Sequence, residues 1–515
     1  MKHIARVALL LSISCTAYAQ QMPEQLSRYE KIFPALEAVA KEVWTGAEVP
    51  YKDLPVLDYD LDAKTEFLIN YPATPPADYI ATPHIVNGKT VYKKQGALSS
   101  AFPGGQCCRN IGGIPTVTMG YPSSAGAEDI LRILLHEGFH HYQQESLYKT
   151  DTDSVLTRYK RDYLRYSPDS IDYATTLVAE TRILAEMTDS RVRNEGSGEK
   201  EGLGKLAALG TIRKKQLPEP VSLGEDSEFL IEGTAVYVEL RGLELIIGGK
   251  PGLHISTGTL KQLYGQYADH YGPAMLRNQI NLTGTARGEM TYRHALALIK
   301  LLERTAPYWH TGIFPLLPGN NTSKKQAEHG LLKHISDHSL AKMLAAAVNI
   351  SPAEARALAD AAIKEYLSKE DMTLIRKKQE IERKIHEFPF DSGWTYQIDA
   401  GQFLYAYFDY RTGKMYYGDT LENAYLSGLA KIESVDRRLL MTNIAIPIIA
   451  DIYHGQIRFK DTGHNLDDAR VSCAGKHGEI CDTLEISIKG LDVKIINASV
   501  KTDHPGKITF VKLLK

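Results

Sequence analysis

The sequence has no excess of charge of either sign. Its 515 residues carry 60 Lys and Arg against 62 Asp and Glu, which gives a net charge of -2. A surface that binds nucleic acid or an anionic membrane usually needs a clear excess of Lys and Arg. The charge balance therefore favours neither partner. The length favours two domains over one, because a single hydrophobic core rarely grows this large.

Long apolar runs are also missing. The apolar segment near the N-terminus, Val7 to Ile13, is too short to cross a bilayer. It follows a basic start and precedes a small-x-small triplet, which is the pattern of a secretory signal peptide over residues 1–19. A lipid anchor on Cys15 is the less favoured alternative, because Ser12 stands where such anchors usually have Leu. We expect cleavage after Ala19, export to the periplasm or the medium, and no transmembrane segment.

Cysteine is scarce. Four cysteines remain after the expected cleavage, and an even number in an oxidising compartment favours disulfides. Cys473 and Cys481 would close a loop that contains glycine, whereas the adjacent Cys107 and Cys108 either form a vicinal disulfide or stay free thiols. Neither pair has the spacing of a four-cysteine zinc site.

Two common catalytic motifs are absent as well. There is no Gly-x-Ser-x-Gly elbow, so a serine hydrolase is not supported. The glycine-containing stretch GLGKLAALG, 202–210, lacks the flanking strand and the Lys-Ser/Thr pair of a phosphate-binding loop.

Hydrophobic periodicity indicates an α+β protein. A strand-like region with a hairpin turn at Asn87-Gly88 precedes a part that is mostly helical, from about residue 124 to residue 367. Period-two alternation after that predicts a β-sandwich-like domain. We therefore expect a mainly helical domain with a small N-terminal β region over 20–388, followed by a β-rich C-terminal domain over 389–515.

What the sequence does contain is a cluster of titratable residues in ILLHEGFHHYQQE, 133–145. His136 and His140 are four residues apart, so on a helix they share one face and both imidazoles can bind one zinc ion. Glu137 lies beside them and can accept a proton from water and pass it to a leaving amine. Apolar neighbours predict a largely buried helix, and an ordinary histidine pair is the alternative to a metal site. Gln143 is either a hydrogen-bond partner of His140 or a solvent-facing residue.

A third ligand is needed, because catalytic zinc usually has three from the protein. Glu232 lies among apolar residues in SEFLIEGTAVYVELRG, and a carboxylate in that setting needs a partner. Gly233 and Ala235 are small enough to let this helix approach another closely. Glu180 in LVAETRILAEM is a competing ligand, and a buried salt bridge to an arginine is the alternative role for Glu232.

The HExxH helix followed by EGTAVY resembles the gluzincin metallopeptidases. It is most similar to a group of uncharacterised bacterial exported proteins that share the order HExxH, a helix with Glu and Arg, Glu-Gly-x-Ala-x-Tyr, and a Tyr-containing helix ending in Pro-x-Trp. That last element corresponds to residues 291–309, and the resemblance covers roughly residues 110 to 310. It implies a zincin-like catalytic domain, Zn2+ as cofactor, Glu137 as general base, and three ligands: His136, His140 and Glu232. The 92 residues from His140 to Glu232 are more than typical gluzincins have.

Hydrolysis of this kind also needs a donor for the oxyanion. Tyr292 and His294 are the best candidates and Tyr237 is a weaker one, with simple core packing as the alternative for Tyr292. The strand GIPTVTMG, 113–120, directly precedes the zinc helix, so we expect it to be an edge strand that pairs with an extended peptide.

These features predict an exported zinc metallopeptidase that acts on a peptide or protein substrate. One alternative is a zinc hydrolase of a non-peptide amide, such as a cell-wall component. Another is a catalytically inactive binding protein on the same scaffold, although such a protein would not need Glu137. Neither the substrate nor the oligomeric state follows from the sequence.

Overall fold

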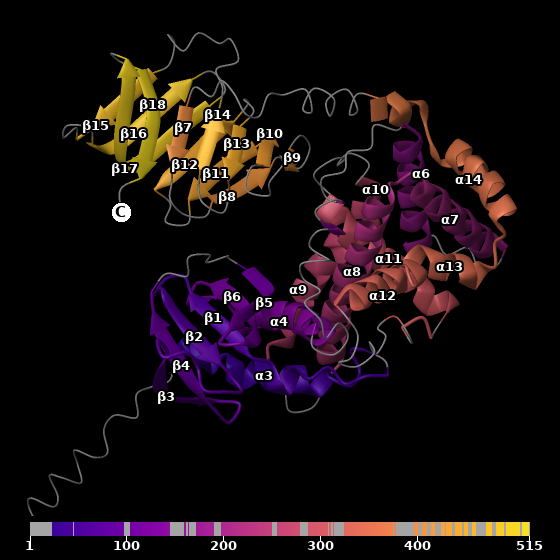
Figure 1. Ribbon diagram of the computed structural model, residues 1–515, viewed down its shortest axis with the longest axis horizontal. Coiled ribbons are helices and arrows are strands. Elements are labelled where there is room, and N and C mark those ends of the chain that lie inside the picture. The colour runs from indigo at the N-terminus through magenta and orange to yellow at the C-terminus, as the bar shows by residue number, and fades with distance from the viewer. Residues whose placement is uncertain are drawn as a thin grey trace, which may run out of the picture. The chain divides into compact units, whose positions relative to one another are not determined.

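The computed structural model describes residues 23–376 and 396–513, with gaps of which the longest are 97–103, 145–158, 164–170, 190–196, 279–286, 314–323 and 460–469. The predicted signal peptide and the predicted domain boundary at 388/389 lie outside the described residues. Contacts group the chain into two compact units, Met1–Ser146 with Val238–Tyr267 and Leu147–Tyr237 with Ala268–Lys515. The expected mixture of helices and sheets is confirmed (Figure 1).

The N-terminal β region is one six-stranded sheet in the order β3-β4-β2-β1-β6-β5. Its strands are β1 (Val56–Asp60), β2 (Thr65–Ile69), β3 (Ile80–Val86), β4 (Lys89–Gln95), β5 (Gly104–Ile111) and β6 (Ile114–Tyr121). Asn87 and Gly88 join β3 to β4 with φ of 49° and 75°, so the predicted hairpin turn is confirmed.

The expectation that GIPTVTMG is an edge strand is wrong. It forms most of β6, which pairs in parallel with β1 on one side and antiparallel with β5 on the other. The edge strand at this end of the sheet is β5, whose sequence GGQCCRNI is half-exposed and poor in β-branched residues. Such a sequence suits an edge, whereas the β-branched residues of β6 suit a position between two strands.

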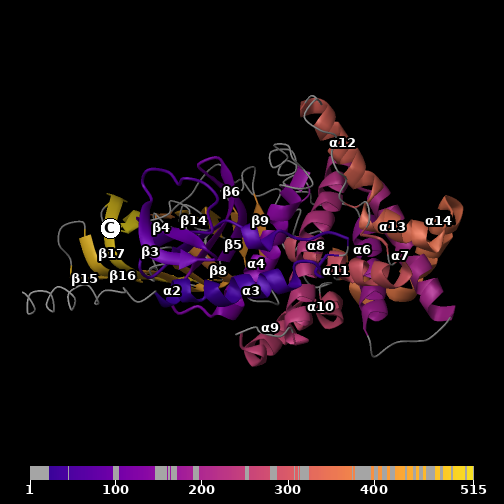
Figure 2. The ribbon, with the colours of Figure 1, turned by 90° about the horizontal axis from the view of Figure 1, so that it is seen from below.

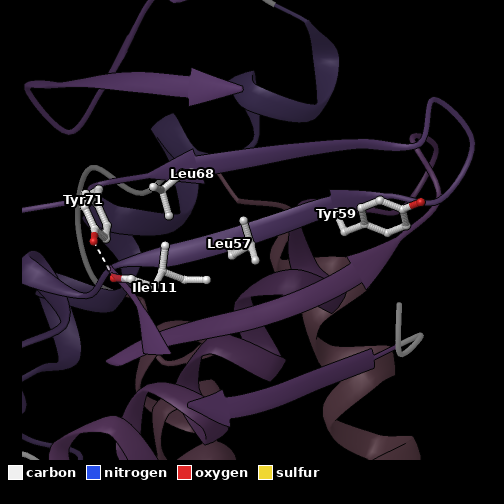
Figure 3. Close-up of a cluster of buried hydrophobic side chains, with 5 residues drawn as sticks. All are labelled: Leu57, Tyr59, Leu68, Tyr71 and Ile111. Atoms are coloured by element: carbon white, nitrogen blue, oxygen red, sulfur yellow. Dashed lines mark hydrogen bonds between the residues drawn. The ribbon is translucent and has the colours of Figure 1, made fainter. Parts of the chain in front are cut away.

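A small apolar core holds this sheet together. Leu57, Tyr59, Leu68, Tyr71 and Ile111 are buried side by side, and the Tyr71 hydroxyl donates a hydrogen bond of 2.5 Å to the Ile111 carbonyl (Figure 3). Ile111 is the last residue of β5, so this bond fastens the end of the edge strand to the core of the sheet.

The helix that carries the HExxH motif is α4 (Ala127–Tyr142), which packs against β5 and β6 and against α3 (Tyr29–Val39). Its buried side has the spacing of an amphipathic helix and consists of Ala127, Ile130, Leu131, Leu134, Leu135, Gly138 and Phe139. The Tyr51 hydroxyl donates a hydrogen bond of 2.9 Å to the Leu135 carbonyl. These contacts fix the helix and leave His136 and His140 half-buried.

The predicted helical part is confirmed from α4 onward. Its further helices are α6 (Ile171–Thr188), α7 (Ser197–Lys215), α8 (Glu219–Ile247), α9 (Thr257–His270), α10 (Pro273–Asn278), α11 (Arg287–Thr305), α12 (Lys324–Asp337), α13 (Leu340–Val348) and α14 (Pro352–Tyr366). Helix α7 packs against α6, α13 and α14 (Figure 2). Gly233 of α8 lies directly against Ala295 of α11, so the predicted close approach of two helices is also confirmed. Among the described residues, no helix has the length and apolar character needed to cross a membrane.

The C-terminal part is rich in strands, as expected. The strands are β7 (Tyr396–Asp399), β8 (Leu404–Phe408), β9 (Lys414–Tyr417), β10 (Ala424–Ser427), β11 (Leu429–Ser434), β12 (Leu439–Ile444), β13 (Ile448–Asp451), β14 (Gln456–Phe459), β15 (Arg470–Ala474), β16 (Ile480–Ile488), β17 (Leu491–His504) and β18 (Lys507–Leu513). Hydrogen bonds connect them into one sheet, and the disulfide Cys473–Cys481 links β15 to β16. The sandwich-like packing of these strands stays a prediction.

Candidate metal centre

Three side chains form a group that could hold a metal ion. His136 and His140 of α4 and Glu232 of α8 each offer one ligand atom, and these atoms lie within 4.8 Å of one another. The two Nε2 atoms are 3.1 Å apart. Two nitrogens bound to one tetrahedral zinc at about 2.0–2.1 Å would lie roughly 3.3 Å apart, so the observed spacing fits a shared ion. All three residues are half-buried.

The hydrogen bonds on the far side of each imidazole decide which nitrogen carries the proton. His136 Nδ1 lies 3.0 Å from Glu239 Oε2, and His140 Nδ1 lies 2.7 Å from Gln143 Oε1. Both partners are oxygens, so each Nδ1 donates and each Nε2 of a neutral ring is left as an acceptor. Two acceptor nitrogens aimed at each other repel unless a proton or a metal ion lies between them. The group could therefore hold a metal ion, and Gln143 is confirmed as a partner of His140.

Glu239 is a site residue that the sequence analysis missed. It is buried, and burial alone would raise its pKa, but the hydrogen bond to His136 and the charge of Arg132 outweigh that effect and lower the pKa. Arg132 Nη1 donates to Glu239 Oε1 at 2.8 Å. A signal was present in the sequence. Glu239 lies two helical turns after Glu232 on the same helix face, and Arg132 lies one turn before His136.

Replacing Glu239 by glutamine is expected to weaken metal binding by about 10- to 100-fold, which is the usual effect of losing an outer partner of a ligating histidine. Glutamine can still accept from His136 but does not carry the charge that polarises the ring. Competition with a chromophoric chelator measures the affinity. Glu244→Gln is the matched control, since Glu244 lies on the same helix but bonds Tyr264 at the surface. Equal affinities in the two variants would exclude this role for Glu239.

Glu137 lies beneath the edge strand of the N-terminal sheet. The backbone N–H of Cys107 donates to Glu137 Oε2 at 2.7 Å. Gly105 lies against the stem of the same side chain, since a Cβ there would be 2.9 Å from Glu137 Cγ. Strand β5 thus restrains the carboxylate at one oxygen and along its stem, and the residue sits next to His136 in the motif helix.

Lys160 and Tyr292 also lie at Glu232. Lys160 Nζ lies 3.0 Å from Glu232 Oε1 and 3.0 Å from Glu228 Oε2, so one ammonium bridges two carboxylates a helical turn apart. Burial, the charges of Glu232 and Glu228 and a hydrogen bond to Glu232 raise the pKa of Tyr292 well above its usual value. Tyr292 is therefore a neutral hydroxyl that donates to Glu232. The structure brings Tyr292 to the candidate ligand and adds Lys160, which the sequence analysis had not selected.

Glu180, the competing ligand, lies elsewhere. Arg213 Nε donates to Glu180 Oε2 at 2.5 Å, and the same guanidinium pairs with Glu225. All three side chains are buried. The buried salt bridge to an arginine that was considered for Glu232 is thus formed by Glu180 and Glu225, whereas Glu232 pairs with a lysine.

The other two oxyanion candidates lie in different surroundings. His294 is completely buried beside the ring of Phe229, and burial and the charge of Arg213 lower its pKa to about 3. It is therefore a neutral residue of the helical core and is not part of the ligand group. The Tyr237 hydroxyl donates to Glu303 at 2.6 Å, and its ring meets Trp309 edge-on.

Comparison with known proteins does not assign this chain to a family. No protein-family model, no curated protein and no solved structure matches this chain. The class that the described residues support is thus a protein with a His-His-Glu group able to hold a metal ion. Function has to be argued from that group, because a fold alone does not imply an activity.

Proposed function

We propose that the protein is a zinc-dependent hydrolase of the gluzincin type that cleaves peptide bonds. One observation carries the proposal. The Nε2 atoms of His136 and His140 face each other at 3.1 Å while both Nδ1 atoms donate to oxygens, and a Glu232 oxygen completes the group. Two neutral imidazoles and one carboxylate match the donor set of catalytic zinc, which usually keeps a fourth position open. Calcium and magnesium prefer oxygen ligands and fit less well.

The residues around this group have the types that peptide hydrolysis needs. Bound zinc would supply Lewis acidity toward a carbonyl oxygen and toward water. Glu137 takes a proton from the attacking water while the water oxygen bonds the carbonyl carbon. Glu137 then delivers that proton to the amine nitrogen as the C–N bond breaks. Tyr292 is the residue we propose as oxyanion donor, since its neutral hydroxyl lies at Glu232.

A basic side chain pairs with a carboxylate on each side of the group. Arg132 pairs with Glu239 behind His136, and Lys160 pairs with Glu232 and Glu228. The proposal includes export, for which the N-terminal sequence and the two disulfides are the support.

Metal removal tests the proposal. We expect the purified mature protein to contain one zinc per chain and to cleave casein or members of a peptide library. Chelation should abolish cleavage and added zinc should restore it, because hydrolysis depends on the metal. Elemental analysis and mass spectrometry of the products are the measurements. Stoichiometric zinc without cleavage of any peptide would point instead to a non-peptide substrate or a binding protein. Absence of stoichiometric metal would reject the metal site itself.

A further inference from the structure

The edge strand above Glu137 contains a β-bulge. Gln106 pairs with Thr118 and Arg109 with Thr116, so Cys107 and Cys108 together stand opposite the single residue Val117. Bulges leave one residue outside the ladder and can direct its backbone groups elsewhere. Here the N–H of Cys107 is directed at Glu137 Oε2, 2.7 Å away. The bulge is therefore what brings a backbone donor to the carboxylate.

The two bulge residues are joined by a disulfide, Cys107–Cys108. A bond between adjacent side chains closes a small ring that restricts the backbone of both residues. The ladder to β6 does not hold these two residues, so the ring supplies the restraint that pairing supplies elsewhere in β5. Gly105 restrains the same carboxylate along its stem, two residues earlier in the strand.

We propose that the vicinal disulfide Cys107–Cys108 is a positioning device for Glu137, which keeps the Cys107 N–H on the carboxylate in the oxidised protein and releases it on reduction. The inference rests on the proposed function only for its kinetic consequence. The carboxylate oxygen that Cys107 does not bind is the one that accepts the proton. A general base that is less well placed loses rate, and displacements of about 1 Å can cost on the order of 100-fold.

The chemical step is a thiol–disulfide exchange with a dithiol. The Sγ–Sγ bond of Cys107–Cys108 breaks and takes up two electrons and two protons, which gives two thiols. The dithiol loses the same two electrons and two protons and closes to its own disulfide. A phosphine serves as the laboratory reductant, because it binds zinc weakly. It is oxidised to the phosphine oxide with an oxygen atom from water.

Hydrogen exchange tests the structural part of the inference. The experiment uses the metal-free protein and does not depend on enzymatic activity. Deuterium uptake by the peptide 104–111 is measured in the metal-free protein, oxidised and reduced, with alkylation to verify that Cys107 and Cys108 are thiols. We expect faster uptake after reduction, and similarly fast uptake in Glu137→Ala, which removes the acceptor of the Cys107 N–H. The variant C473S/C481S has only the vicinal disulfide and should show the same response. Unchanged uptake after verified reduction overturns the inference.

Kinetics test the functional part. In the zinc-loaded protein, reduction is expected to lower kcat about 10- to 100-fold with little change in KM or zinc content, and reoxidation should restore it. The variant C107S/C108S should have the lowered kcat and no response to the reductant. Full activity in that variant, or in the verified reduced protein, overturns the inference while the proposed function stands. If the oxidised wild type has no Glu137-dependent cleavage, the proposed function fails, and the exchange result still decides whether the disulfide positions Glu137.

Discussion

Glu232→Gln is expected to empty the metal centre, whereas Glu228→Gln is expected to leave it loaded. The two residues lie one turn apart on α8, and both contact Lys160 Nζ at 3.0 Å. Only Glu232 belongs to the group with His136 and His140. An amide is a far weaker zinc ligand than a carboxylate. The loss in zinc affinity should therefore exceed about 100-fold, which is the largest usual effect of losing a hydrogen-bond partner of a ligating histidine.

The measurement is zinc content after dialysis, followed by chelator competition, in both variants and the wild type. The pair is well matched, because each change removes one charge from the same Lys160 contact. Glu180→Gln is a second control, and it should retain zinc but unfold at a lower temperature, because it weakens a buried pair with Arg213. If Glu228→Gln or Glu180→Gln lost zinc and Glu232→Gln kept it, the third ligand would be wrongly assigned.

Glu137→Gln is expected to lower kcat by about 100- to 10,000-fold while zinc content stays the same, since a general base commonly contributes that much. Glutamine has nearly the same shape, and its oxygen can still accept from the Cys107 N–H at the place of Oε2. It cannot accept a proton from water. The prediction thus separates proton transfer from packing and from metal binding.

Initial rates at several substrate concentrations give kcat and KM separately, and zinc is measured on the same samples. Glu128→Gln is the matched control, because Glu128 lies in the first turn of the same helix and accepts from the backbone of Ser256. It should keep normal kcat. A Glu137→Gln variant with unchanged kcat would show that another residue is the base, or that the cleavage measured comes from a different protein.

Local patterns predicted much of the fold. The spacing of apolar residues predicted the helices from α4 onward, and alternation predicted the strands of the C-terminal part. The turn at Asn87-Gly88 followed from the residue types alone, since both positions adopt left-handed backbone angles. Each of these depends on neighbours in the chain, which is why sequence periodicity suffices.

Strand order was not predictable in the same way. The strand β6 was expected at the edge because it directly precedes the motif helix. The parallel pairing with β1 instead places it inside the sheet and leaves β5 at the edge. Which strand takes the edge is decided by pairings between distant segments, such as Val56 with Val117. The residue types of β5 and β6 agree with the outcome but do not specify which strands pair.

For the candidate site, the sequence by itself determined the motif on α4, because residues four apart on a helix must share a face. It also selected Glu232 from its apolar surroundings. Only the tertiary structure decided between Glu232 and Glu180, because both are carboxylates on helices among apolar residues. They differ in the basic side chain that each one contacts, Lys160 for Glu232 and Arg213 for Glu180. Arg213 engages Glu180 in the core, whereas Glu232 lies with the histidines. The outer partner Glu239 and the Cys107 N–H are likewise contacts between distant segments, and packing alone creates them.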